Sequence, residues 1–296
     1  MDKKLHDYEV FEENPLSKVW IVGTNPKDVS INPNKDKYNV YIANQHHYRE
    51  NIDKLNRIWC EYCGMYYVWK NNLHSDFVGF CHYRRLIDVG KEEREKIKEN
   101  NSIMYFSHII SYNNNINENY SWLKCQLASF QCPPSIIEDV IDFLDNQNYV
   151  SSDKIKDICN LEKVPFHNRE IFYTTWDKFC DMMKFLNEYF EFIAKKYEIK
   201  SIDDWKTHVS EHIISYYKKI YPTIRQCVLD MFSSKYCYQT LRKYKRIFDE
   251  DEGYYQFCNC WRIYAYITEV LISLWISSHP KSRGNKMFEE GKYVLS

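Results

Sequence analysis

The chain has 296 residues, and its 40 basic residues are balanced by 41 acidic ones, giving a formal net charge of -1. A near-neutral balance argues against a nucleic-acid-binding protein, which usually carries a clear basic excess. Only 7 glycines and 8 prolines occur, which excludes collagen-like or linker-dominated chains, and the length allows a full core without disulfides or a structural metal.

Strands that alternate with helices are predicted in the first half of the chain. Short β-branched and apolar runs indicate strands, and the run at 76–81 is continuous enough to be buried on both faces. Apolar residues at helical spacing predict one uninterrupted helix over 52–70. The expected strands are 17–23, 38–43, 76–81 and 103–110, and the expected helices are 52–70 and 91–98.

The second half is predicted to be mostly helical, with helices at 134–144, 175–196, 203–217 and 254–277. No convincing linker divides the sequence. We therefore expect a single domain over residues 1–296, of the α/β class, with a mixed sheet flanked by helices and a helix-rich C-terminal half.

The sequence contains no signal for export or for crossing a membrane. Its first residues carry charges without a following apolar run, and the most apolar stretch, 263–276, is short and is interrupted by Glu269. The 11 cysteines are scattered and odd in number, which is typical of reduced thiols. We expect a cytoplasmic protein in which Cys60 and Cys63 are buried apolar residues and not zinc ligands.

Four polar residues, His82, Tyr83, Arg84 and Arg85, follow directly on the strand expected at 76–81. Ligands of open α/β sheets bind outside the carboxyl ends of the strands. Arginine forms bidentate bonds with phosphate and stays charged at working pH. The segment therefore indicates a site for a phosphorylated ligand, with ordinary surface ion pairs of the two arginines as the open alternative.

The segment from Asn56 to Asp88 resembles the family known as domain of unknown function 4422, whose members occur in capsular and exopolysaccharide gene sets and are regarded as glycosyltransferases of the GT-A type. The similarity lies in an Asn, a Cys-Glu pair, an aromatic helix ending Trp-Lys-Asn, and a strand ending Cys-His-Tyr-Arg-Arg. In this chain these elements are Asn56, Cys60-Glu61, Trp69-Lys70-Asn71 and Cys81-His82-Tyr83-Arg84-Arg85.

A weaker similarity follows near the C-terminus, where Arg262 and Glu269 match the family pattern. Two positions depart from it. Ala265 stands where the family has Gly, and Val270 stands where the family has a second Arg. These departures are what supports the alternative function, a catalytically inactive nucleotide- or glycan-binding protein of the same fold.

The resemblance implies a GT-A-like fold and an enzyme that transfers a sugar from a nucleotide-sugar, with a UDP-sugar as the first choice, to a glycan or lipid-linked acceptor in surface polysaccharide synthesis. The partners are then this donor and acceptor, and no nucleic acid. A lipid-linked acceptor would bring the protein to a membrane surface as a peripheral protein.

The leaving group of such a transfer is a nucleoside diphosphate, whose developing charge must be stabilised. Because no Asp-x-Asp motif follows the strand at 76–81, we expect Arg84 and Arg85 to bind the diphosphate in place of a metal, together with Arg262. His82 would bond a phosphate and Tyr83 would stack on the base or the sugar. No cofactor is then required, with Mn²⁺ or Mg²⁺ as the alternative.

A direct displacement also needs a general base for the acceptor hydroxyl, usually a carboxylate. Glu269 is the first candidate because it lies in an otherwise apolar helix, and Glu61 is the second because it lies in an aromatic one. Asp88, just after the arginines, is the third. A structural ion pair with an arginine is the alternative role for either glutamate.

Overall fold

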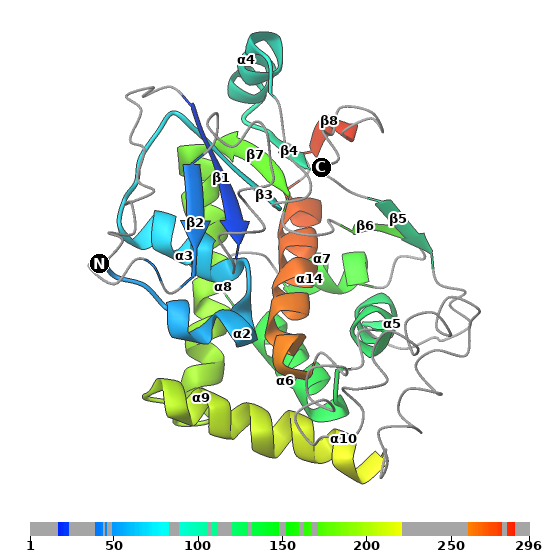
Figure 1. The fold of residues 1–296 in the computed structure, drawn as a ribbon. Helices are drawn as coiled ribbons and strands as arrows, with labels where there is room; N and C mark the ends of the chain where they lie inside the picture. The colour runs from blue at the N-terminus through cyan, green and yellow to red at the C-terminus, as the bar shows by residue number, and fades with distance from the viewer. Residues whose placement is uncertain are drawn as a thin grey trace, which may run out of the picture.

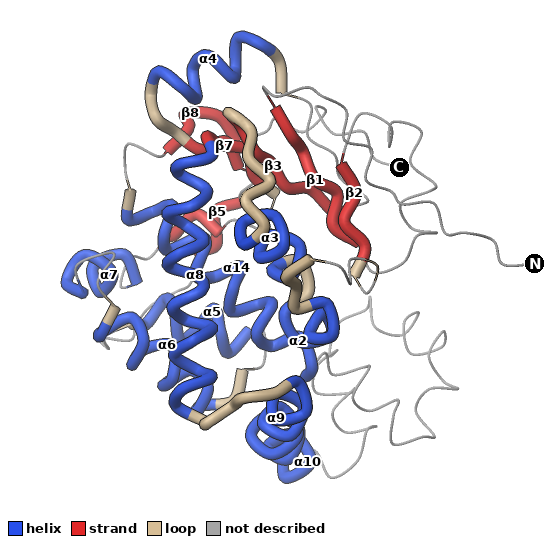
Figure 2. The backbone as a smooth tube through the Cα atoms, turned by 90° about the vertical axis from the view of Figure 1, so that its left-hand side faces the viewer, coloured by secondary structure: helices blue, strands red, loops and turns tan. Residues whose placement is uncertain are grey.

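The computed structural model describes residues 17–23, 39–43, 45, 49–82, 89–105, 108–111, 120–129, 132–147, 152–159, 163–166, 171–220, 260–279 and 283–287. Within them lie a six-stranded sheet, a two-stranded sheet and helices that pack mainly on one side of the larger sheet (Figures 1 and 2). The expected α/β class, with a mixed sheet flanked by helices and a helix-rich C-terminal half, is confirmed.

The six-stranded sheet has the order β2-β1-β3-β7-β4-β8. Its strands β2, β1 and β3 are parallel, β7 is antiparallel to both of its neighbours, and β8 is parallel to β4. The strands are β1 (Ser17–Gly23), β2 (Asn39–Ile42), β3 (Phe77–His82), β4 (Ile103–Tyr105), β7 (Phe172–Thr175) and β8 (Arg283–Met287). A separate antiparallel pair joins β5 (His108–Ser111) to β6 (Lys163–Phe166).

Successive residues of the central strands enter two different apolar clusters, as the two-residue period of a strand requires. In β3, Val78 and Phe80 belong to the larger cluster, whereas Phe77 and Cys81 belong to the smaller one. The strand expected at 76–81 is therefore buried on both faces, as predicted. The larger cluster contains the main helices, and the smaller one includes Ile97 of the charged helix α4.

The longer helices coincide closely with the predicted ones, because each has an uninterrupted apolar stripe that faces the core. None of the described helices is both long enough and apolar enough to cross a membrane. The helical segments are η2 (Asp53–Leu55), α2 (Asn56–Trp59), α3 (Tyr62–Lys70), α4 (Lys91–Glu99), α5 (Ser121–Ser129), α6 (Pro134–Asn146), α7 (Ser152–Cys159), α8 (Trp176–Lys196), α9 (Ile202–His208), η4 (Val209–Ile214), α10 (Ser215–Ile220), η5 (Cys260–Arg262) and α14 (Ile263–Ser278).

Two expectations were wrong in detail. The helix expected over 52–70 is broken at Cys60, which separates α2 from α3. The strand expected over 103–110 is two strands, β4 and β5, which belong to different sheets. The second half is mostly helical, as expected, and it also supplies β7, which lies between β3 and β4 in the large sheet. The first part of the helix expected over 254–277, residues 254–259, lies outside the described residues.

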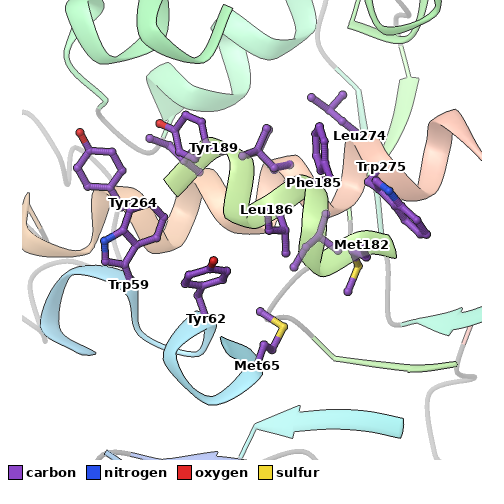
Figure 3. Close-up of a cluster of buried hydrophobic side chains, with 14 of the residues drawn as sticks. Trp59, Tyr62, Met65, Met182, Phe185, Leu186, Tyr189, Tyr264, Leu274 and Trp275 are labelled. Atoms are coloured by element: carbon purple, nitrogen blue, oxygen red, sulfur yellow. The ribbon is translucent and has the colours of Figure 1, made fainter. Parts of the chain in front are cut away.

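The core between α2, α8 and α14 is built largely from aromatic side chains (Figure 3). Trp59 at the end of α2 is fully buried, and its ring stacks on that of Tyr264 with centroids 5.0 Å apart. It also meets Trp205 at right angles, with centroids 5.3 Å apart. Aromatic pairs of this kind add to the stabilisation that burial alone provides, so α2 is firmly attached to α14.

A buried histidine lies beneath this aromatic core. His208 ends α9, is 4% exposed, and its Nε2 lies within hydrogen-bonding distance of the Tyr264 hydroxyl. The ring of His212 lies 4.8 Å away and that of Tyr197 lies 4.1 Å away. Burial, and secondarily the neighbouring His212, lower the pKa of His208 to about 4.

This lowered pKa predicts a loss of stability in mild acid. Above pH ~6.5 the imidazole is neutral in both states, whereas between ~6.5 and 4 only the unfolded chain takes up the proton. We expect His208 alone to cost about 3 kcal/mol of unfolding free energy as the pH falls through this window. Urea unfolding of the wild type and of His208→Gln at pH 7.5 and 4.5 checks this, because the variant should have the flatter pH dependence.

The exposed His74 provides the matched control for this experiment. The His74→Gln variant should keep the pH dependence of the wild type. Equal pH dependence in the wild type and in His208→Gln would contradict the assignment.

Candidate active site

The parallel strands β2, β1 and β3 end at one edge of the sheet. Gly23, the last residue of β1, pairs with Ile42, the last residue of β2, and Val22 pairs with His82 at the end of β3. This common carboxyl edge is where open α/β sheets bind ligands. In Figure 1 the arrowhead of β1 points toward α2.

The first turn of α3 lies against this edge because a glycine permits the close approach. A Cβ atom on Gly64 would lie 2.7 Å from Cγ2 of Val22 in β1 and 3.0 Å from Cδ1 of Tyr41 in β2. Glu61 precedes Gly64 by three residues, and its carbonyl accepts the Gly64 N–H at 3.0 Å. The fold therefore holds Glu61 near the carboxyl ends of β1 and β2.

Arg262 joins Glu61 at this place from the other end of the chain. Its Nη2 lies 4.0 Å from Oε2 of Glu61, and its Nε donates to Sγ of Cys60 at 3.1 Å. The Arg262 side chain is 44% exposed and that of Glu61 is 20% exposed. Two of the predicted site residues are thus brought together, in the ion pair that the sequence left open as the alternative role of Glu61.

Glu269, another predicted site residue, lies on the side of α14 that Arg262 begins. All residues of this helix are buried except Tyr266 and Glu269. Positions 262, 266 and 269 are four and three residues apart, so they lie one above the other on the helix surface. We call Cys60, Glu61, Arg262, Tyr266 and Glu269 the Arg262 cluster.

The charges of this cluster act on one another. Burial raises the pKa of Tyr266, Arg262 lowers it, and Glu269, Cys60 and Glu61 raise it. Burial alone would lower the pKa of Arg262, but Cys60, Glu61 and Tyr266 together raise it above its ordinary value. The guanidinium also lies 5.8 Å from the centroid of the Tyr266 ring. The cluster therefore holds a permanent cation that remains accessible from solvent.

The other predicted site residues are only partly described. His82 is the last residue of β3, so its backbone lies at the carboxyl edge. Tyr83, Arg84, Arg85 and Asp88 lie outside the described residues, and their roles stay predictions.

Two features near this edge had no clear signal in the sequence. Arg57 on α2 places its guanidinium 4.8 Å from the ring centroid of Trp261, next to Arg262. Asp53, which is 2% exposed, accepts a hydrogen bond from the Tyr41 hydroxyl at the end of β2. An acidic residue at the start of a helix ordinarily indicates a solvated position, so only the tertiary structure identifies Asp53 as buried.

Cysteines and metal ligands were the other chemical groups considered. Seven cysteines among the residues with described positions form no disulfide: Cys60, Cys63, Cys81, Cys125, Cys132, Cys159 and Cys180. The same part of the chain holds no group of three or more His, Cys, Asp and Glu side chains arranged for a metal ion.

Comparison with known proteins gives one family and one solved structure. The profile of the family described as "Domain of unknown function (DUF4422)" matches residues 6–281. A search of curated proteins gives no match. A solved structure described as the apo form of WbbM, a bifunctional glycosyltransferase, is similar with a TM-score of 0.39 and 17% identity, over 63% of this chain and 38% of that chain. The chain thus spans well under half of that protein's length.

Proposed function

The chain belongs to the family described as "Domain of unknown function (DUF4422)", and from this premise we propose that it is a glycosyltransferase. It would move a sugar from a nucleotide-sugar, with a UDP-sugar as the first choice, to a glycan or lipid-linked acceptor in surface polysaccharide synthesis. The observation that carries the proposal is the Arg262 cluster, in which a cation is paired with Glu61 near the carboxyl ends of parallel strands and a second carboxylate, Glu269, lies on the same face of α14.

The cation suits the leaving group of this reaction. As the bond between the anomeric carbon and the diphosphate breaks, negative charge accumulates on the phosphate oxygens, and a fixed cation stabilises it. Arg262 is charged at every working pH and is 44% exposed. Arg84 and Arg85, which follow β3 in the sequence, would complete the diphosphate site, with His82 and Tyr83 beside them.

The carboxylates suit the other half of the reaction. The acceptor hydroxyl forms the new bond to the anomeric carbon and gives its proton to a general base. We assign this role to Glu269, because Glu61 is the ion-pair partner of Arg262 and so already balances that cation. Asp88 stays the further candidate.

The alternative is an inactive binding protein of the same fold. Ala265 and Val270, the two departures from the family pattern, are 2% and 0% exposed. Both side chains belong to the buried surface of α14 and not to its exposed stripe. The transferase is favoured because the groups that it needs, Glu61, Arg262 and Glu269, are all present in this chain.

Thermal unfolding of the pure protein in the presence of nucleoside diphosphates and nucleotide-sugars, with and without Mn²⁺, tests the proposal. A ligand that binds only the folded state stabilises it, by about 2.7 kcal/mol at a hundredfold excess over Kd. We expect one diphosphate to stabilise the protein without metal, and the Arg84→Ala/Arg85→Ala variant to lose this effect. Release of the diphosphate from the matching nucleotide-sugar then measures turnover.

The other outcomes are equally informative. Stabilisation that requires Mn²⁺ would retain the transferase and contradict the metal-free diphosphate site. Stabilisation without turnover would favour the inactive binding protein. No stabilisation by any diphosphate or nucleotide-sugar would contradict the proposed function.

A further inference from the structure

The backbone of Cys60 has a conformation that its residue type disfavours. Its φ is 44° and its ψ is -119°, in the positive-φ half of the Ramachandran plot where glycine is the usual residue. A side chain held in such a region costs of the order of 1–3 kcal/mol, and it persists only where the surroundings fix it. Strain of this kind is concentrated at functional sites.

Asn56 is the main residue that fixes it. The Cys60 N–H donates to the Asn56 carbonyl at 2.8 Å, and the Asn56 side-chain amide donates from Nδ2 to the Cys60 carbonyl at 3.1 Å. The N–H of Cys63 donates to the same carbonyl, also at 3.1 Å. Asn56 is itself only 8% exposed, so a buried polar side chain is committed to holding one turn of backbone.

This backbone turn has a consequence for the side chains that follow. It ends α2, places the Cys60 sulfur 3.1 Å from Nε of Arg262, and starts α3 with Glu61 beside Nη2 of the same arginine. A guanidinium has five N–H donors, and these two contacts orient it through Nε and one edge. In a regular helix through residue 60, the side chains of Cys60 and Glu61 would point about 100° apart around the helix axis. They would then not both reach Arg262.

We propose that Cys60, held by Asn56, is a positioning residue that orients the Arg262 guanidinium toward the phosphate oxygens of the nucleoside diphosphate. This inference rests on the proposed function. The sulfur accepts the Nε–H bond, the Glu61 carboxylate lies 4.0 Å from Nη2, and the remaining N–H groups of the guanidinium would bind the phosphate oxygens. The strained backbone at Cys60 keeps the Arg262 side chain in one orientation before the ligand binds. A flexible arginine side chain would lose rotamer entropy on binding, which would weaken the affinity.

Three substitutions at Cys60 separate positioning from a purely structural role. Cys60→Gly relieves the backbone and removes the sulfur, Cys60→Ala keeps the strain and removes the sulfur, and Cys60→Ser keeps a side-chain acceptor. We expect Cys60→Gly to melt at or above the wild-type temperature and yet bind the stabilising diphosphate about tenfold more weakly, since a bond to a charged group is lost. Cys60→Ser should recover part of the affinity.

The matched control is Cys180→Ala, which removes a half-buried thiol from α8 and should leave the Kd unchanged. A further test variant is Asn56→Asp, which replaces the amide donor by an acceptor of equal size and should weaken binding as Cys60→Ala does. A wild-type Kd in both Cys60→Gly and Cys60→Ala would overturn the proposal.

A second readout keeps this inference separate from the proposed function. If the wild type binds no diphosphate, the proposed function fails, and the Cys60–Arg262 contact is then tested by unfolding in urea. The midpoint shift of Cys60→Ala/Arg262→Ala should be smaller than the sum of the two single shifts, because both substitutions remove one bond. Additive shifts would overturn the positioning role even there.

Discussion

The Arg262→Ala variant is expected to lose about 10²–10³-fold in the rate of sugar transfer while it remains folded. The proposed reaction develops charge on the leaving diphosphate, and Arg262 is the described cation beside the carboxyl edge that pairs with Glu61. The stability should fall by only about 1–3 kcal/mol, because the partly exposed ion pair contributes ~1 kcal/mol or less and the bond to Cys60 is one hydrogen bond of a charged group. Turnover from diphosphate release and the thermal midpoint measure the two effects.

Two further arginine variants sharpen this experiment. Arg262→Lys keeps the charge but loses the planar fork, so its rate should lie between those of the wild type and Arg262→Ala. Arg57→Ala removes the neighbouring guanidinium, which stacks on Trp261, and should retain most of the activity. Full activity in Arg262→Ala would remove Arg262 from the diphosphate site.

The Trp59→Ala variant is expected to lose about 3–5 kcal/mol of unfolding free energy. Trp59 is 0% exposed and lies against the rings of Tyr62, Tyr189, Phe190, Trp205 and Tyr264. Alanine leaves a large cavity between α2, α8 and α14, while no hydrogen bond of the indole Nε1 to the described residues is lost. Urea unfolding should show a lower midpoint at an unchanged slope.

A second tryptophan in the same region is the control. Trp69 on α3 is only partly buried, and Trp69→Ala should cost far less than Trp59→Ala. Equal losses in the two variants would contradict the view that Trp59 is the central contact between α2 and α14. Because α2 leads directly into Cys60 and Glu61, Trp59→Ala should also weaken diphosphate binding.

Periodicity was sufficient to locate most elements, and its failures have particular physical causes. The apolar spacing continues from Ile58 and Trp59 to Tyr62, so no pattern marks the break at Cys60, where a Gly or Asn would have done so. The strand β7 is a run of only four residues, Phe172–Thr175, immediately followed by the apolar start of α8. A short strand of this kind cannot be distinguished from the first turn of the helix.

The site was predictable only to the extent that its residues are close in sequence. Arg262, Tyr266 and Glu269 have the spacing of a single helical stripe, so their common side could be read from the sequence. The meeting of Arg262 with Cys60 and Glu61 could not, because it depends on how α14 packs against α2. The roles of Arg84, Arg85 and Asp88 stay predictions.

The position of β7 also bears on how the chain acquires its structure during synthesis. Phe77 in β3 pairs with Thr175 in β7. The ribosome therefore synthesises β7 long after β3 and β4, the two strands between which it lies in the sheet. Contacts so distant in sequence form slowly, since a long loop must close first. Until then β3 has an open edge with Val78 and Phe80 nearby, and such edges recruit other chains. Fragments that end before β7 are therefore expected to aggregate when they are expressed alone.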